Sequence, residues 1–139
     1  MRIISAKERG FTLIELLVAM TIAAVWMGIA LVSYQGARKS ARDGKRKSDL
    51  EQIRSALEMC RADTGNYPVG HDLPGTCSTY LPSVPSDPLS PTYQYRYNGS
   101  ANSYTLCAYL ETGVVITNCT GNCGGNCGSV DCNYKTCNP

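Results

Sequence analysis

The chain has 139 residues, which is enough for one modest domain and one long element but not for two large hydrophobic cores. Its formal net charge is only +2, so overall charge indicates no polyanionic partner. The charges are unevenly distributed, because bases gather between residues 38 and 47 and acids outnumber bases from residue 48 onward.

An apolar segment runs from Phe11 to Tyr34 and contains one charged residue, Glu15. A helix of this length extends about 36 Å, more than the hydrocarbon thickness of about 30 Å. The segment is longer than the apolar region of a secretory signal peptide, about 7–15 residues, and its best small-x-small triplet, residues 28–30, lies inside it. We therefore predict a membrane-spanning helix.

Glu15 needs a partner in such a helix. An acid at the centre of a membrane helix costs about 2.5–3.5 kcal/mol, and less near the interface. A plain membrane anchor explains the span but not this acid. If the chain were cut after Gly10, the new α-amine of Phe11 would lie four residues from Glu15, on the same helix face. The amine of a neighbouring chain could serve equally well, and either pairing neutralises two charges that neither could bury alone.

The stretch GFTLIELLV, residues 10–18, follows a short basic leader and resembles the processing site of type IV prepilins and type II secretion pseudopilins. The resemblance implies that a prepilin peptidase cuts between Gly10 and Phe11 and N-methylates Phe11. It also implies that Glu15, with Phe11, directs assembly. Many pilins carry a proline in the apolar half of this helix, and this chain has none between Phe11 and Asn66. The resemblance continues to the tyrosine-rich segment and weakens in the cysteine-rich tail.

Beyond Tyr34 the pattern becomes amphipathic. Small residues recur at helical spacing and would let another backbone approach closely: Ala37, Ala41, Gly44 and Ser48. Larger side chains repeat the spacing and are expected to dock on a globular domain: Leu50, Ile53, Leu57 and Cys60. Gly65 suits the position after a helix and Pro68 forbids continuation. One helix from Phe11 to about Asp63 is therefore predicted.

The basic residues of the amphipathic part have three interpretations. The cluster consists of Arg38, Lys39, Arg42, Lys45, Arg46 and Lys47. It can be a solvated helix face, a contact with lipid headgroups or with the acidic heads of neighbouring subunits, or a nucleic-acid site. No aromatic residue interrupts the cluster to stack on bases, so nucleic acid is not an expected partner.

The head is predicted to hold an antiparallel sheet. Residues 66–91, rich in Pro, Gly and Ser, read as an ordered loop. Alternation predicts strands at Thr92–Asn98 and Ser103–Leu110, and a third is expected at Val114–Thr117. The stripe of larger residues on the helix would cover the sheet. Tyrosines at 93, 95 and 97 are interpreted as a half-buried packing face rather than a carbohydrate site or an electron path.

Eight cysteines in a short chain indicate a fold held by disulfides in an oxidising compartment. The candidates are Cys60, Cys77, Cys107, Cys119, Cys123, Cys127, Cys132 and Cys137. Their connectivity stays open, because about 105 pairings exist. Zinc is disfavoured: C-x3-C spacing is tolerated, but C-x2-C pairs are missing and the single histidine, His71, is distant. No metal or cofactor is expected. Calcium stays open, because the resemblance implies a calcium site near this end: related pseudopilins bind calcium there. In this chain Asn118, Asn122, Asn126 or Asp131 could hold it.

These expectations define an α+β fold with four parts. Residues 1–10 are the leader, 11–34 the transmembrane and assembly helix, 35–64 the amphipathic half of the helix, and 65–139 the head with its cysteine-rich tail. The predicted function is a structural subunit of a pilus-like filament. A type II secretion or competence pseudopilin and a non-polymerising membrane-anchored binding module are the alternatives. An enzyme is not expected, because the sequence has no Gly-rich phosphate loop, no G-x-S-x-G and no C-x-x-C pair.

The resemblance implies as partners further pilin subunits of its own or another kind, a prepilin peptidase, an inner-membrane assembly platform and the membrane. Before assembly the chain would cross the cytoplasmic membrane once, with its head outside; afterwards it would form a cell-surface or periplasmic filament. The bases at 38–47 instead favour a cytoplasmic head by the positive-inside rule. We favour an external head, because the cytosol would keep the cysteines reduced.

Overall fold

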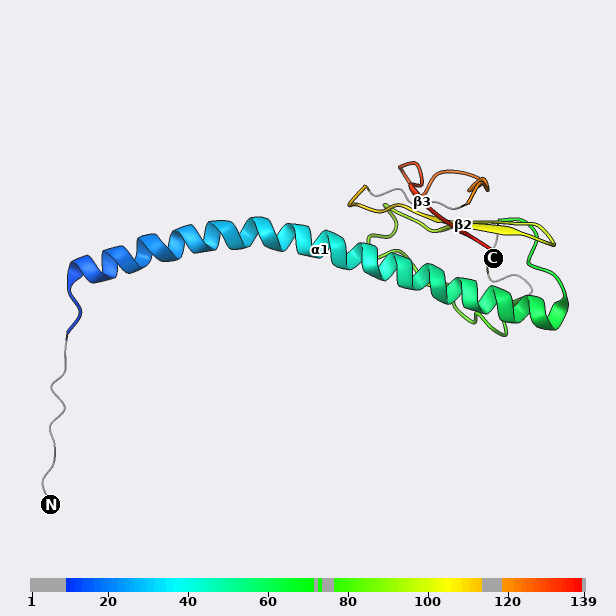
Figure 1. Ribbon diagram of the computed structural model, residues 1–139, viewed down its shortest axis with the longest axis horizontal. Helices are drawn as coiled ribbons and strands as arrows, with labels where there is room; N and C mark the ends of the chain where they lie inside the picture. The colour runs from blue at the N-terminus through cyan, green and yellow to red at the C-terminus, as the bar shows by residue number, and fades with distance from the viewer. Residues whose placement is uncertain (1–9, 72, 74–76, 114–118, 139) are drawn as a thin grey trace, which may run out of the picture. The chain divides into compact units, whose positions relative to one another are not determined.

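The computed structural model describes residues 10–71, 73, 77–113 and 119–138. Their elements are helix α1 (Leu13–Thr64) and strands β1 (Arg96–Gly99), β2 (Tyr104–Ala108) and β3 (Tyr134–Cys137) (Figure 1). The α+β fold is confirmed: a long N-terminal helix, a small antiparallel sheet and a disulfide-rich C-terminal region. The chain divides into two compact units, residues 1–37 and 38–139, which are described separately.

The first unit contains the apolar part of α1. All of its described residues, from Gly10 to Ala37, are exposed to solvent. By length and composition, α1 is apolar enough near its N-terminus to cross a membrane, and none of that window is buried inside the chain. None of the described residues therefore covers these apolar side chains, as expected of a segment that meets lipid or other helices.

The second unit packs its sheet on the amphipathic part of α1. Leu50, Ile53, Leu57 and Cys60 are each 0% exposed, so the predicted docking stripe is confirmed. They share one core cluster with residues of β1 and β2: Tyr97, Tyr104, Leu106 and Ala108. α1 ends at Thr64, and Gly65 follows with a positive φ of 83°, a conformation that favours glycine.

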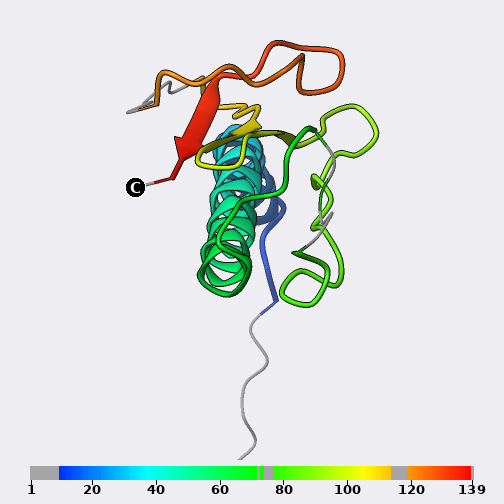
Figure 2. The same cartoon turned by 90° about the vertical axis from the view of Figure 1, so that its right-hand side faces the viewer.

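The sheet has the order β1-β2-β3, with both neighbouring pairs antiparallel. β1 begins at Arg96, so the predicted strand from Thr92 starts too early. The third strand, β3, comes from the tail, where no strand was predicted. The strand predicted at Val114–Thr117 lies outside the described residues. Figure 2 shows the tail strand and the loops of the second unit around the end of α1.

The tail covers the face of β2 that points away from the helix. All five residues of β2 are buried, although a half-buried strand shows alternation. Tyr104, Leu106 and Ala108 belong to the core cluster beside the helix, whereas Cys107 belongs to a second cluster with Cys123 and Cys127. The sheet is therefore a middle layer between the helix and the tail.

Four disulfides hold this arrangement, and they use all eight cysteines. Cys60–Cys77 joins α1 to the following loop, and Cys107–Cys123 joins β2 to the tail. Two more lie within the tail: Cys119–Cys137 and Cys127–Cys132. Their Cα–Cα distances of 5.1–5.8 Å fall in the usual range, so the backbone positions are compatible with bridging.

Candidate assembly site

The predicted processing site lies just outside the helix. Gly10 and Phe11 have no regular secondary structure, and the Phe11 side chain is 83% exposed. Thr12 caps the helix: its Oγ1 accepts a hydrogen bond from the Glu15 backbone N–H (3.3 Å), and its carbonyl accepts one from Leu16 (3.2 Å). The peptide between Gly10 and Phe11 is therefore accessible in the uncut chain.

Thr12 and Glu15 form the sequence pattern of a capping box, Thr-x-x-Glu, which our sequence analysis missed. The Thr-x-x-Glu pattern is visible in the sequence, but we had interpreted Glu15 only as the assembly residue that the resemblance implies. An acid in the first turn also faces the positive end of the helix dipole, which stabilises a carboxylate. Glu15 therefore has a local reason to be where it is, besides any role in assembly.

The helical spacing assumed for Phe11 and Glu15 does not hold in the uncut chain. α1 begins at Leu13, so Phe11 is not on a helix face with Glu15. Among the described residues, the Glu15 carboxylate has no hydrogen-bond or ion-pair partner, and it is exposed. A partner from a neighbouring chain does not depend on that spacing. The processing and assembly roles of Gly10, Phe11 and Glu15 stay predictions.

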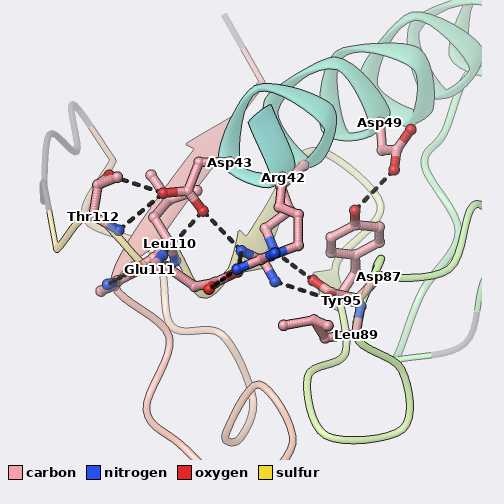
Figure 3. Close-up of polar contacts among 11 residues, drawn as sticks. Arg42, Asp43, Asp49, Asp87, Leu89, Tyr95, Leu110, Glu111 and Thr112 are labelled. Carbon is pink, nitrogen blue, oxygen red and sulfur yellow. Dashed lines mark hydrogen bonds and ion pairs between the residues drawn. The ribbon is translucent and has the colours of Figure 1, made fainter. Parts of the chain in front are cut away.

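A second group of polar residues fixes the head on α1 (Figure 3). Its centre is Arg46, which is 0% exposed. Its guanidinium donates two hydrogen bonds to Asp87, from Nε at 2.7 Å and from Nη2 at 3.0 Å. Nη1 donates to Asp43 at 2.7 Å and to Glu111 at 2.8 Å. One side chain of the helix thus joins two segments of the head, because Asp87 and Glu111 lie on different loops.

The neighbours of Arg46 complete this ion network, which we define as Arg42, Asp43, Arg46, Asp87 and Glu111. Arg42 binds both carboxylate oxygens of Glu111, at 2.7 Å and 2.5 Å. Asp43 accepts hydrogen bonds from the backbone N–H groups of Glu111 (3.0 Å) and Thr112 (2.9 Å), and one from the Thr112 hydroxyl (2.8 Å). The carboxylates are therefore hydrogen-bonded on several sides, as burial requires.

These contacts shift the titration of the network. The hydrogen bonds from Arg42 lower the pKa of Glu111. Burial acts to raise the pKa of Asp43, but the backbone N–H groups of Glu111 and Thr112 outweigh it and hold that pKa below its usual value. Burial disfavours the charge on Arg46, but the surrounding carboxylates raise its pKa. These shifts favour the charged forms of Asp43, Glu111 and Arg46 at neutral pH.

This finding corrects the interpretation of the basic cluster. For Arg46 and Arg42 the prediction of a solvated face or an outer contact is wrong, because both are bound to carboxylates of the head. Lys45 also pairs with a buried acid, Asp49, at 2.6 Å, and Tyr95 donates to that acid at 2.8 Å. Helical spacing places acids and bases on one face, but it does not show which loops supply their partners.

The cysteines bring together the densest group of potential metal ligands. The Sγ atoms of Cys107, Cys123 and Cys132 all lie within 4.8 Å of one another. Of the four residues considered for calcium, Asn118 lies outside the described residues. Asn122 uses its Oδ1 to accept a hydrogen bond from Gly124 at 3.1 Å. Calcium binding through any of the four residues stays untested.

The N-terminal part of α1 is apolar and exposed and follows a short basic leader, and the C-terminal part of α1 packs on a small α+β head. These features define a pilin-like subunit anchored in a membrane. Two family profiles match the chain: the prokaryotic N-terminal methylation motif over residues 5–31, and type II secretion system (T2SS), protein G, over residues 33–118. The chain belongs to the type II secretion protein G family. The residues beyond 118, with five cysteines, lie outside that match.

Curated relatives bear the same family name. The chain is 30% identical to the type II secretion system core protein G of Escherichia coli over 66% of this chain and 59% of that protein. It is 26% identical to the Klebsiella pneumoniae protein of that name, over 81% of this chain and 91% of the relative, and 24% identical to the Dickeya chrysanthemi protein, over 81% and 83%. The match to the first relative thus spans less than two thirds of its length. No solved structure matches the chain.

We expect Arg46→Ala to destabilise the head by about 3–5 kcal/mol, because it leaves the buried carboxylates of Asp43 and Asp87 without their arginine partner. The measurement is denaturant unfolding of the full chain in detergent micelles. Near-ultraviolet circular dichroism of tyrosine reports the head, because only Tyr34 of the nine tyrosines lies in the first unit. Lys39→Ala is the matched control, an exposed cation of the same helix, expected to change stability by less than about 0.5 kcal/mol. Equal effects of the two variants would contradict the network.

The head should also lose stability in acid. Asp43 and Glu111 have folded-state pKa values below their unfolded ones, so the folded state binds fewer protons and stability increases with pH across that window. Their contribution is complete above the unfolded pKa, about 4, and disappears as pH falls through the folded values. Unfolding free energies measured from pH 7 to pH 2 test this. Asp43→Asn should flatten the slope below about pH 4, and an unchanged slope would reject the assignment.

Proposed function

We propose that the chain is a subunit of the pseudopilus of a type II secretion system, assembled through α1 after its leader has been removed. The observation that carries the proposal is Glu15: an exposed carboxylate in an apolar helix, without a partner among the described residues. In hydrocarbon such a group needs a counter-charge, and a neighbouring subunit is the source that a filament provides. The names of the relatives and the match to protein G support a secretion filament.

The amine exposed by leader removal is the proposed counter-charge. Phe11 lies directly before the cap formed by Thr12, so its new amine would lie at the N-terminal end of α1. When two helices pack side by side with an axial offset, the amine of one can reach Glu15 of the other. The pairing neutralises both charges during insertion into the filament and favours a single axial offset between neighbouring subunits.

A surface pilus is the second candidate, and the cysteine-rich head favours it. A fibre outside the cell has more use for a head held by four disulfides than a short periplasmic one. Our sequence analysis favoured this candidate. The family match supports the alternative given there, the secretion pseudopilin, and we prefer it. In both cases the role is structural, and we propose neither catalysis nor a cofactor for it.

We expect Glu15→Gln to leave the chain in the membrane fraction and to reduce its incorporation into filaments at least tenfold, because the counter-charge to the amine is lost. The assay is crosslinking and electron microscopy of filaments from cells that express the full chain, with surface and periplasmic fractions compared. Glu51→Gln is the matched control, an exposed acid on the head half of the same helix. Normal filament yield from Glu15→Gln would remove the assembly role. Long fibres on the cell surface would favour the pilus instead.

The mature chain is expected to begin with N-methylated Phe11. Mass spectrometry of the N-terminal peptide from membrane-extracted protein measures this directly. Gly10→Leu should stay uncut and still insert, because the change alters the processing site but not the apolar segment. A filament-incorporated chain that still starts at Met1 would contradict the proposed order of events.

A further inference from the structure

Two disulfides lie against each other at the centre of the tail. Cys107–Cys123 joins β2 to the tail, and Cys127–Cys132 closes a loop beside it. The Sγ atoms of Cys107, Cys123 and Cys132 lie within 4.8 Å of one another, and Cys127 is bonded to the last of them. Cys107 and Cys127 are 0% exposed and Cys123 is 6% exposed. The two disulfides are therefore adjacent, with three of their cysteines buried and Cys132 partly exposed.

This spacing is close to that of a tetrahedral metal centre. Zinc–sulfur bonds of about 2.3 Å place the sulfurs of a four-cysteine site about 3.8 Å apart. Once the disulfides are open, small rotations about the Cα–Cβ bonds can bring the sulfurs of Cys107, Cys123 and Cys132, now within 4.8 Å of one another, to this spacing. The Sγ of Cys127, released from its bond to Cys132, supplies the fourth position. The tail provides three of the cysteines with C-x3-C and C-x4-C spacing, which zinc loops tolerate. β2 provides the fourth.

The backbone that carries these cysteines is also held by contacts other than disulfides. Asn133 exchanges hydrogen bonds with the backbone of Leu110, at 2.6 Å and 2.8 Å, next to Cys132. Asn98 donates to the carbonyl of Asn122 at 2.9 Å, next to Cys123. Gly128 pairs with Tyr93 and has a φ of +88°; a Cβ there would collide with the Thr92 carbonyl. Opening both disulfides therefore leaves the sulfurs near their positions.

The surrounding charges suit an anionic centre. One Zn²⁺ with four thiolates carries a net charge of −2, and such a centre is stabilised by nearby cations. Arg96 donates to the carbonyl of Asn126 at 2.6 Å, and Lys135 donates to that of Gly121 at 3.0 Å. Both cations are thus attached to the segment that holds the cysteines. Within the described residues, no other three cysteine, histidine or acidic side chains come this close together.

We propose that Cys107, Cys123, Cys127 and Cys132 bind one Zn²⁺ in the reduced chain, so that the tail has two interchangeable cores. The reduced state holds zinc through four thiolates, and the oxidised state holds two disulfides. Two molecules of a disulfide oxidant convert the first into the second: each takes two electrons, four thiolates leave from the oxidant, and the Zn²⁺ is released. The remaining pairs, Cys60–Cys77 and Cys119–Cys137, take no part. This inference goes beyond the proposed role in secretion and does not rest on it.

Cobalt titration of the reduced chain tests the site. The full chain is reduced in detergent micelles with a phosphine, the excess is removed without air, and Co²⁺ is added. We expect one Co²⁺ per chain, with the visible bands of tetrahedral cobalt and intense thiolate-to-cobalt absorption in the near ultraviolet. Equimolar Zn²⁺ should abolish both signals. A reduced chain that takes up no cobalt overturns the proposal, whether or not its head stays folded.

Matched double variants locate the metal. Cys127→Ser with Cys132→Ser removes two ligands and should abolish the thiolate–cobalt signal at equimolar Co²⁺. Cys60→Ser with Cys77→Ser, and Cys119→Ser with Cys137→Ser, remove two cysteines each outside the cluster and should keep it. Equal losses in all three variants would overturn the assignment. Adding glutathione disulfide to the zinc-loaded chain should release one Zn²⁺ for every two disulfides formed, and zinc that stays bound after oxidation would also overturn it.

Discussion

The fold of the head depends on one buried cation. The Arg46 side chain extends from α1, is fully buried and meets three carboxylates, two of which belong to loops far away in the sequence. An isolated charge in that position would cost several kcal/mol, so the position is stable only when Asp87 and Glu111 are both in place. The network has a net charge of −1, from three acids and two arginines. The Arg46 guanidinium also lies 5.3 Å from the centroid of the Tyr93 ring. Such a network contributes less to net stability than its number of contacts suggests, because removing the charges from water costs free energy that offsets their attraction. Well-packed apolar residues could give similar stability. We infer that its main effect is to fix the placement of these loops on the helix.

Because the head packs on one face of α1, the opposite face of the helix can carry small residues. Most of the buried helix residues between 43 and 60 are large or charged, Ala56 being the small exception, whereas the exposed positions Ala41, Gly44 and Ser48 are all small. A helix face that covers the apolar core of the head needs larger side chains. A face of small residues instead lets another backbone come close, and a Cβ added at Gly44 would meet nothing within 4 Å in this chain. The head thus takes its support from one side of α1 and leaves the small residues Ala41, Gly44 and Ser48 of the other side exposed.

Periodicity predicted the parts of the fold that repeat locally. The docking stripe from Leu50 to Cys60, the end of the helix at Gly65 and the existence of a small antiparallel sheet follow from spacing and from glycine and proline. The third strand does not, because Tyr134–Cys137 has no clear alternation in burial and forms by pairing with β2 about 30 residues earlier in the chain. The same reason hid the ion network: Arg46 has one partner at helical spacing, Asp43, and two that only the tertiary fold supplies. Disulfide connectivity is equally non-local, and the sequence left it open.

The tail shows why a small head needs covalent and ionic support. Its sheet has strands of four or five residues, and its core is a single cluster between helix and sheet. A domain of this size buries too little apolar surface to keep a glycine-rich tail in place by packing alone. The tail therefore uses short-range devices, namely Cys107–Cys123 on β2, backbone pairing with Thr105 and Cys107, and the amide of Asn133 on Leu110. Because several of these contacts are independent of oxidation, the four clustered cysteines stay close to one another in either redox state. Because the four cysteines stay close together after reduction, their thiolates can bind the Zn²⁺ that we propose.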